Sequence, residues 1–190
     1  MKIIIGLVGE QAAGKGTVAS YLEEKYGAAK IRFSDSLFDI LKRLHLPPRR
    51  EHLVTLSEIL RAAFGEDLLS RVVADDAFSI PNELLVIDGV RRLDDLATLE
   101  KLPEFRLIAI EATVEIRYER LKKRGEKPGE TELTFEEFVK SHDLPTEKTI
   151  AEVARLATEK IINNGSREDL HSQIDSLLRK FGVAKVASHQ

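Results

Sequence analysis

The residues best suited to chemistry form one glycine-rich segment, Gly9-Glu10-Gln11-Ala12-Ala13-Gly14-Lys15-Gly16-Thr17. The G-x-x-x-x-G-K spacing is typical of a loop whose backbone N–H groups surround a phosphate, because glycines let the chain curl closely around the anion. Lys15 brings a full positive charge to the β- and γ-phosphate oxygens, and the start of a helix adds positive potential. A glycine-rich turn with a surface lysine is the alternative. We predict that seven residues bind nucleotide phosphates: Gly9, Ala12, Ala13, Gly14, Lys15, Gly16 and Thr17.

The residue after the lysine narrows the class of phosphate-binding loop. GTPases and many ATPases place Ser or Thr directly after the lysine, where its hydroxyl binds Mg²⁺. Here Gly16 stands at that place, so the next residue, Thr17, is the candidate hydroxyl ligand for Mg²⁺. The chain has no N-K-x-D sequence for guanine, which disfavours a GTP-dependent switch. Glu10 is larger than the residues usual in such loops, and the sequence reveals no role for it.

A second candidate group follows the apolar run 84–87. Asp88 ends that run, and an acidic residue at the end of a buried strand can hold Mg²⁺ through water. A turn or capping aspartate is the alternative. Arg91 lies just beyond, where open α/β sheets bind ligands, and its guanidinium can grip a phosphate with two hydrogen bonds. Arg92 is interpreted as a solvated neighbour.

Three arginines form a helical stripe later in the chain. Arg117, Arg120 and Arg124 are spaced i, i+3, i+7, on one side of a predicted helix that ends at Gly125. Guanidinium groups at the base of a mobile loop can close over phosphates in a transition state. The alternative is a solvated helix face, because acidic and lysine side chains interrupt the stripe.

Asp35 is a further candidate, because it follows the second predicted strand. At that place it would lie near a phosphoryl acceptor, as a base or as an orienting group. The alternative is a helix N-cap, for which Ser34, Asp35 and Ser36 are all suitable residue types.

The elements that would position these residues alternate between strands and helices. Short apolar runs predict strands near 3–8, 29–33, 84–87, 106–111 and 160–163. Amphipathic patterns predict helices over 15–26, 51–64, 66–78, 94–102, 114–124 and 149–157, one carrying Leu37 to Leu44, and one capped by Ser166. This alternation predicts an α/β fold of parallel β-α units, with helices on both faces of the sheet.

Composition excludes several function classes. The 190 residues include 29 Lys and Arg against 32 Asp and Glu, a net charge of −3, which disfavours a nucleic-acid binder. The absence of Cys excludes disulfides, Cys-ligated metals and a thiol nucleophile, and it fits a cytoplasmic protein. No apolar run approaches the roughly 20 residues of a membrane span. The five histidines show no metal-ligand spacing.

Residues 1–182 resemble the P-loop nucleoside monophosphate kinase group, including adenylate-kinase-like, dephospho-CoA-kinase-like and deoxynucleoside monophosphate kinase proteins. The matching segments are 9–17, 33–35, 86–91, 117–125 and 150–169. The resemblance implies a P-loop NTPase core with a five-stranded parallel sheet in the order 2-3-1-4-5. It implies one kinase domain with a core over 1–33, 84–124 and 148–182, an acceptor-binding insert over 34–80 and a lid over 125–147. It also implies that Asn163, Asn164 and Gly165 lie near the base of the donor nucleotide.

These observations predict a kinase that uses ATP and Mg²⁺ and acts on a small phosphorylated acceptor, most simply a nucleoside or deoxynucleoside monophosphate. Dephospho-CoA, with its 3′-hydroxyl, is the alternative acceptor. A non-catalytic nucleotide sensor is the other alternative, because His142 stands where these families commonly carry an arginine. No nucleic-acid or membrane partner is expected, and the protein is predicted to be a monomer or small homo-oligomer. The predicted catalytic residues are Lys15, Asp35, Arg91, Arg120 and Arg124, with Arg117 on the ATP.

Overall fold

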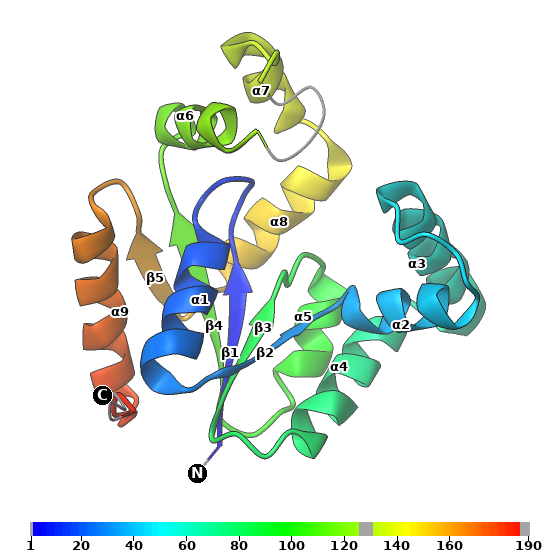
Figure 1. Ribbon diagram of the computed structural model, residues 1–190, viewed down its shortest axis with the longest axis horizontal. Helices are drawn as coiled ribbons and strands as arrows, with labels where there is room; N and C mark the ends of the chain where they lie inside the picture. Colours follow the sequence, from blue (N-terminus) through cyan, green and yellow to red (C-terminus); the bar gives the residue numbers. More distant parts are fainter. Residues whose placement is uncertain (1, 126–130, 187–190) are drawn as a thin grey trace.

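A parallel five-stranded sheet forms the centre of the molecule (Figure 1). The computed structural model describes residues 2–125 and 131–186. The strand order β2-β3-β1-β4-β5 and the parallel pairing confirm the predicted topology. The strands are β1 (Ile3–Val8), β2 (Ala29–Arg32), β3 (Leu84–Asp88), β4 (Phe105–Glu111) and β5 (Glu159–Ile162).

Helices cover both faces of the sheet, as expected for a three-layer α/β/α fold. They are α1 (Lys15–Tyr26), α2 (Asp35–Arg43), α3 (Arg50–Phe64), α4 (Leu68–Ser79), α5 (Leu93–Leu99), α6 (Val114–Arg124), α7 (Phe135–Ser141), α8 (Pro145–Arg155) and α9 (Arg167–Lys180). No helix in the described ranges has the length and apolar character that crossing a bilayer demands.

The two faces of β1 enter two separate cores. Ile5 and Leu7 pack in a cluster with α1 and α9, whereas Ile4 and Val8 pack in a cluster with α4, α5 and α8. All six residues of β1 are buried, which explains why its sequence is continuously apolar and does not alternate. Because the strand is parallel to both neighbours, its carboxyl end lies at the same edge of the sheet as the ends of β3 and β4.

Element boundaries differ from the sequence prediction in two informative places. Helix α7 was not predicted, yet Thr134 and Glu137 form a capping box: the Glu137 N–H donates to Thr134 Oγ1 at 3.2 Å and the Thr134 N–H donates to Glu137 Oε2 at 2.8 Å. Helix α8 begins at Pro145 instead of 149, because proline is well suited to the first helical position. The predicted cap at Ser166 is confirmed.

Helices α2 to α4 form an excursion between β2 and β3, and α3 stands apart from the sheet in Figure 1. One buried ion pair ties this excursion to the core. Arg61 of α3 is 5% exposed, and its Nη2 donates to the Asp95 carboxylate of α5 at 3.0 Å. Burial raises the pKa of Asp95, and the adjacent Arg61 counteracts that rise. Helix α5 begins at Leu93, two residues after Arg91, so this pair joins the excursion to the loop that carries Arg91.

We expect Arg61→Leu to lower the free energy of unfolding by about 3–5 kcal/mol at neutral pH, because it leaves the Asp95 carboxylate buried without a counter-charge. Urea unfolding measures this loss. The control is Arg71→Gln, whose pair with Asp67 is solvent-exposed and contributes about 1 kcal/mol or less. The double variant Arg61→Leu/Asp95→Leu should recover much of the stability. A loss for Arg61→Leu as small as that of the control would contradict this view of the pair.

Candidate nucleotide-binding site

The glycine-rich loop connects β1 to α1, and close packing fixes its shape. Gly14 has φ 110° and is the N-cap of α1. A Cβ atom on Gly14 would lie 2.2 Å from Asn163 Nδ2, and one on Gly9 would lie 2.4 Å from the Ile110 carbonyl oxygen. Both positions therefore require glycine for lack of space. The loop leads directly into the helix start, as the predicted backbone anion site requires; phosphate binding by these residues stays a prediction.

Lys15 lies inside this loop among other charged groups. Its Nζ donates to the Gly9 carbonyl at 2.5 Å and to the Glu10 carbonyl at 3.1 Å. The pKa of Lys15 is lowered to about 8, mainly by burial and next by Arg91, with a smaller contribution from Arg117; Asp88 and Glu147 oppose the fall. The fold thus brings Asp88, Arg91 and Arg117 within electrostatic reach of Lys15, although these residues come from three different segments of the chain.

Asp88 ends β3 at the carboxyl edge of the sheet, opposite Leu7 of β1 on one side and Arg32 of β2 on the other. Its carboxylate is about one-fifth exposed, and its Oδ2 is 4.0 Å from Lys30 Nζ. Thr17 lies exposed in the first turn of α1. One carboxylate, one hydroxyl and phosphate oxygens make a donor set suited to Mg²⁺, which keeps several waters and takes one or two protein ligands. No group of three acidic or histidine side chains suited to a metal occurs in the described ranges.

Glu10 acquires a role in the structure that the sequence did not reveal. Its Oε2 pairs with Arg117 Nη2 at 3.1 Å, and its Oε1 is 3.9 Å from His142 Nε2. Arg117 is 4% exposed, and its Nε donates to the Ala112 carbonyl at 3.2 Å. Burial lowers the pKa of Arg117, and Glu10 is the main group opposing that effect. Glu10 therefore supplies the counter-charge for a buried arginine of α6. The prediction that Arg117 contacts ATP stays a prediction.

Helix α7 packs on α6 next to this pair. Phe138 of α7 is 1% exposed, and its ring lies 5.6 Å from Arg117 Cζ and 5.1 Å from the His142 ring. Tyr118 Oη donates to the Leu133 carbonyl at 2.9 Å. The predicted lid segment 125–147 thus includes a packed helix; its residues 126–130 lie outside the described residues.

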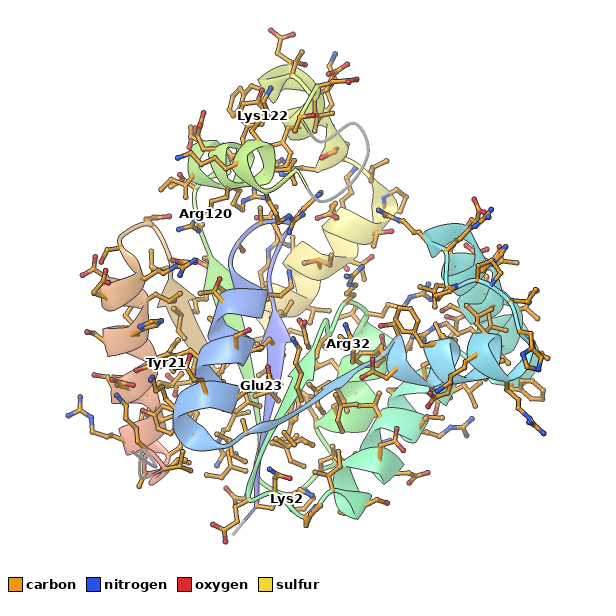
Figure 2. All side chains as sticks on the ribbon, in the orientation of Figure 1. Lys2, Tyr21, Glu23, Arg32, Arg120 and Lys122 are labelled. Carbon is orange, nitrogen blue, oxygen red and sulfur yellow. The ribbon has the colours of Figure 1, made fainter. Side chains whose placement is uncertain are left out.

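Asn163 links the phosphate-binding loop to the arginine helix. Its Nδ2 donates to the Ala13 carbonyl at 2.8 Å, and its Oδ1 accepts from Arg120 Nη2 at 3.2 Å. Asn163 is 5% exposed; its hydrogen bond to Ala13 is buried, and the one from Arg120 is partly buried. Burial lowers the pKa of Arg120, and its Nη1 is buried with no partner in the described part of the chain. Figure 2 shows Arg120 extending from α6 toward the loop region.

The remaining predicted site residues occupy varied environments. Asn164 Oδ1 accepts from the Thr113 N–H at 2.9 Å, which joins the loop after β5 to the start of α6. Gly165 lies next to Asp169, the partner of Ser166 in the capping box of α9. Arg124 lies exposed at the last position of α6.

The environment of Asp35 contradicts one of its two sequence-based interpretations, that of a helix N-cap. Asp35 lies inside the first turn of α2, and Ser34 is the N-cap, without a side-chain capping bond. The Asp35 carboxylate instead accepts from Arg32, at 2.8 Å from its backbone N–H and at 3.0 Å from its Nε. The N-cap interpretation of Asp35 is therefore wrong, because the local turn directs its carboxylate back to β2.

Sequence reasoning missed several members of this site. Arg32 and Glu147 were not singled out, because a charged residue at a strand end or in an exposed helix carries no motif. The buried Glu147 Oε2 has no hydrogen-bond partner among the described residues, and its charge acts on Lys15 and Arg117. A signal for Asn163 did exist in the Asn-Asn-Gly sequence after the last strand, although it did not specify the contact with Ala13.

The fold and the loop together define a P-loop protein of the kinase-like class. A family model described as "AAA domain" matches residues 5–145. A Methanoregula boonei protein named UPF0200 is 31% identical over 183 residues, covering 94% of this chain and 97% of that protein. The chain belongs to this AAA-domain family and is a homologue of the UPF0200 proteins. UPF0200 proteins of Hyperthermus butylicus and Sulfurisphaera tokodaii are 27% and 29% identical, and each alignment covers about 95% of both chains.

Solved structures show the same fold at low sequence identity. A shikimate kinase from Bacteroides thetaiotaomicron is 15% identical with a TM-score of 0.61, covering 95% of this chain and 99% of that one. The Thermus thermophilus protein TT1252 is 24% identical with a TM-score of 0.60, covering 94% and 97%. At these identities the similarity shows the fold alone, which is a P-loop kinase-like α/β fold.

The pKa of Lys15 generates a pH prediction. Below pH 8 the ammonium is charged, and a bound polyphosphate favours that charged form, so binding raises the pKa. Affinity for Mg²⁺-ATP should therefore be constant from pH 6.5 to 7.5 and fall by about tenfold or more between pH 7.5 and 9.5. Isothermal titration calorimetry measures this. Lys15→Arg, whose guanidinium stays charged, should show a flatter profile. If ATP affinity changed with pH in the same way in both proteins, the assignment of Lys15 to the ATP phosphates would be refuted.

We expect Asn163→Ala to weaken ATP binding by about tenfold, because it releases both the Ala13 carbonyl and Arg120. The free energy of unfolding should also fall by about 1–3 kcal/mol, as expected when buried hydrogen bonds are lost. Asn82→Ala is the matched control, because Asn82 also donates to a backbone carbonyl, that of Gly27, but is exposed and remote from the loop. If Asn163→Ala lost stability and kept full ATP affinity, Asn163 would be a structural residue alone.

Proposed function

We propose that this protein is an ATP-dependent phosphotransferase that moves the γ-phosphoryl group of ATP to a nucleoside or deoxynucleoside monophosphate. The observation that carries the proposal is the convergence of Lys15, Arg91 and Asp88 at the carboxyl edge of the sheet, beside the phosphate-binding loop. A P-loop alone supports nucleotide binding. The added cation after β3 supports transfer to an anionic acceptor.

In the proposed reaction an oxygen of the acceptor phosphate attacks the γ-phosphorus of ATP. A new P–O bond forms on the acceptor, the bond from the γ-phosphorus to the β–γ bridging oxygen breaks, and ADP departs. The acceptor needs no base, because the second pKa of a phosphate monoester is about 6. The protein therefore acts chiefly by positioning the reactants and neutralising charge.

Charge neutralisation is assigned to residues of three elements. Lys15 faces the β- and γ-phosphates from the loop, and Arg91 faces the acceptor side. Arg120 and Arg124 of α6 face the donor from the lid side. Thr17 directly and Asp88 through water are the residues suited to hold Mg²⁺, which would supply positive charge that offsets the charge of the phosphates. Acceptor binding is assigned to the excursion α2–α4, and this assignment and the domain boundaries remain predictions.

The alternative acceptor, dephospho-CoA, would present a hydroxyl whose proton must leave during transfer. A carboxylate base would then help by about 10²–10⁴-fold. Asp35 is the nearest candidate from the sequence, yet both of its oxygens accept hydrogen bonds from Arg32. This arrangement favours an acceptor that is already ionised.

The decisive experiment is transfer from ATP to a panel of AMP, CMP, UMP, the deoxynucleoside monophosphates and dephospho-CoA. We expect turnover with at least one monophosphate. Lys15→Ala should reduce kcat by about 10² or more, since it removes a preorganised charge from the transition state, while stability changes little.

Lys25→Ala is the matched control for loss of a lysine from the same helix. Lys25 is exposed and pairs with Glu24, so activity should stay within twofold of the parent. Near-normal turnover by a folded Lys15→Ala protein would refute the loop assignment. Tight ATP binding without transfer to any acceptor would instead support the nucleotide-sensor alternative.

A further inference from the structure

The guanidinium of Arg32 is held by neighbouring side chains, while its terminal nitrogens make no hydrogen bond to any described residue. Asp35 holds it from one side, accepting from the Arg32 backbone N–H and from Nε. The Phe38 ring lies 5.9 Å from Arg32 Cζ, within cation–π range. Throughout residues 2–125 and 131–186, no hydrogen bond or ion pair engages Nη1 or Nη2. The side chain is 53% exposed, so those four N–H groups are open to a ligand.

The strand register places Arg32 beside the candidate catalytic groups. Arg32 ends β2 opposite Asp88, the last residue of β3. The preceding pair, Ile31 and Ile87, belongs to the core formed with α4, α5 and α8. Because side chains alternate along a strand, Arg32 and Asp88 both project from the other face, where α1 and the phosphate-binding loop lie.

A second guanidinium, that of Arg91, lies on the same side of the loop. It is three residues beyond Asp88, it is exposed, and it acts electrostatically on Lys15. Arg91 has no hydrogen bond or ion pair with any residue that the structure describes. Figure 2 shows Arg32 where β2 runs into α2, on the side of the sheet toward the α2–α4 excursion. Arg32 and Arg91 thus flank Asp88 with uncommitted donors.

We propose that Arg32, together with Arg91, binds the phosphate of the acceptor, and that Asp35 acts through Arg32 as a positioning residue. This inference rests on the proposed function and adds to it a binding residue, Arg32, and a positioning residue, Asp35, for the phosphate of the acceptor. A guanidinium with a free end is suited to bidentate contact with phosphate oxygens. The Asp35 brace reduces the rotamer freedom that Arg32 would lose on binding. Each oxygen of Asp35 already accepts one hydrogen bond from Arg32, so the carboxylate is engaged in holding that guanidinium.

The test compares each monophosphate with its own nucleoside, measured by calorimetry without ATP: AMP with adenosine, CMP with cytidine and dTMP with thymidine. For the parent protein we expect at least one monophosphate to bind about tenfold tighter or more than its nucleoside, as a charge-assisted hydrogen-bonded pair would give. Arg32→Gln should reduce that ratio to about threefold or less and leave ATP affinity within twofold.

Two further variants separate positioning from base catalysis. Asp35→Asn should lower the same ratio by a smaller factor and reduce kcat less than about tenfold. The double variant Arg32→Gln/Asp35→Asn should bind no more weakly than Arg32→Gln alone, because both changes act through one guanidinium. Arg43→Gln, which removes an exposed arginine at the end of α2, is the matched control and should change nothing.

Several outcomes would overturn the assignment. The first is an affinity ratio of monophosphate to nucleoside that is near one in the parent protein. The second is a ratio that is unchanged in Arg32→Gln. The third is a loss of about 10³-fold in kcat for Asp35→Asn with acceptor affinity preserved. The last would make Asp35 a base for a hydroxyl acceptor. If monophosphates bind through Arg32 yet no phosphoryl transfer occurs, the proposed function fails and the Arg32 site stands. If transfer occurs and the affinity ratio of monophosphate to nucleoside is unchanged in Arg32→Gln, the proposed function stands and the Arg32 site fails.

Discussion

Mutual repulsion among cations at one edge of the sheet is the constraint on which the rest of the structure depends. Lys15, Arg91 and Arg117 are close enough that both arginines lower the pKa of the lysine. Like charges gathered in a partly dry site are costly without an anion. The protein limits this cost with carboxylates that face the same place, those of Glu10, Asp88 and Glu147. A polyphosphate ligand would meet cations that the fold has already assembled, which is the essence of electrostatic preorganisation.

Holding those cations together requires contacts between segments that are remote in sequence. The Asn163–Ala13 hydrogen bond joins residues 150 apart, and the contact between Arg117 and the Gln11 carbonyl joins residues 106 apart. The parallel sheet makes such contacts possible, because it brings every strand's carboxyl end to one edge. The buried Arg61–Asp95 pair does the same for the excursion between β2 and β3. Contacts with distant parts of the chain therefore hold the phosphate-binding loop in place, in addition to its own local sequence.

This distribution explains what the sequence could predict. The loop, the apolar strands and helix α6 (Val114–Arg124) were predictable, because local spacing and periodicity encode them. The strand order came from family resemblance, since periodicity says nothing about which strands are neighbours. The roles of Glu10 and Asn163 were not predictable, because each depends on a partner more than 100 residues away. Helix α7 could have been predicted from the sequence, because Thr134 and Glu137 have the spacing of a capping box.

The proposed donor and acceptor ends of the site are built in different ways, and this difference bears on motion. Long-range contacts fix the donor end, whereas the Arg32–Asp35 brace is an i, i+3 contact within one turn. Arg32 belongs to β2 and Asp35 to the first turn of α2, so this brace keeps its geometry under a shift of α3, the helix that stands apart from the sheet in Figure 1. Ties to α5 at Arg61–Asp95 and Arg92–Glu66 set where such a shift would hinge. The proposed phosphotransferase activity would need this combination, because a donor loop must stay preorganised while the acceptor side closes to exclude water.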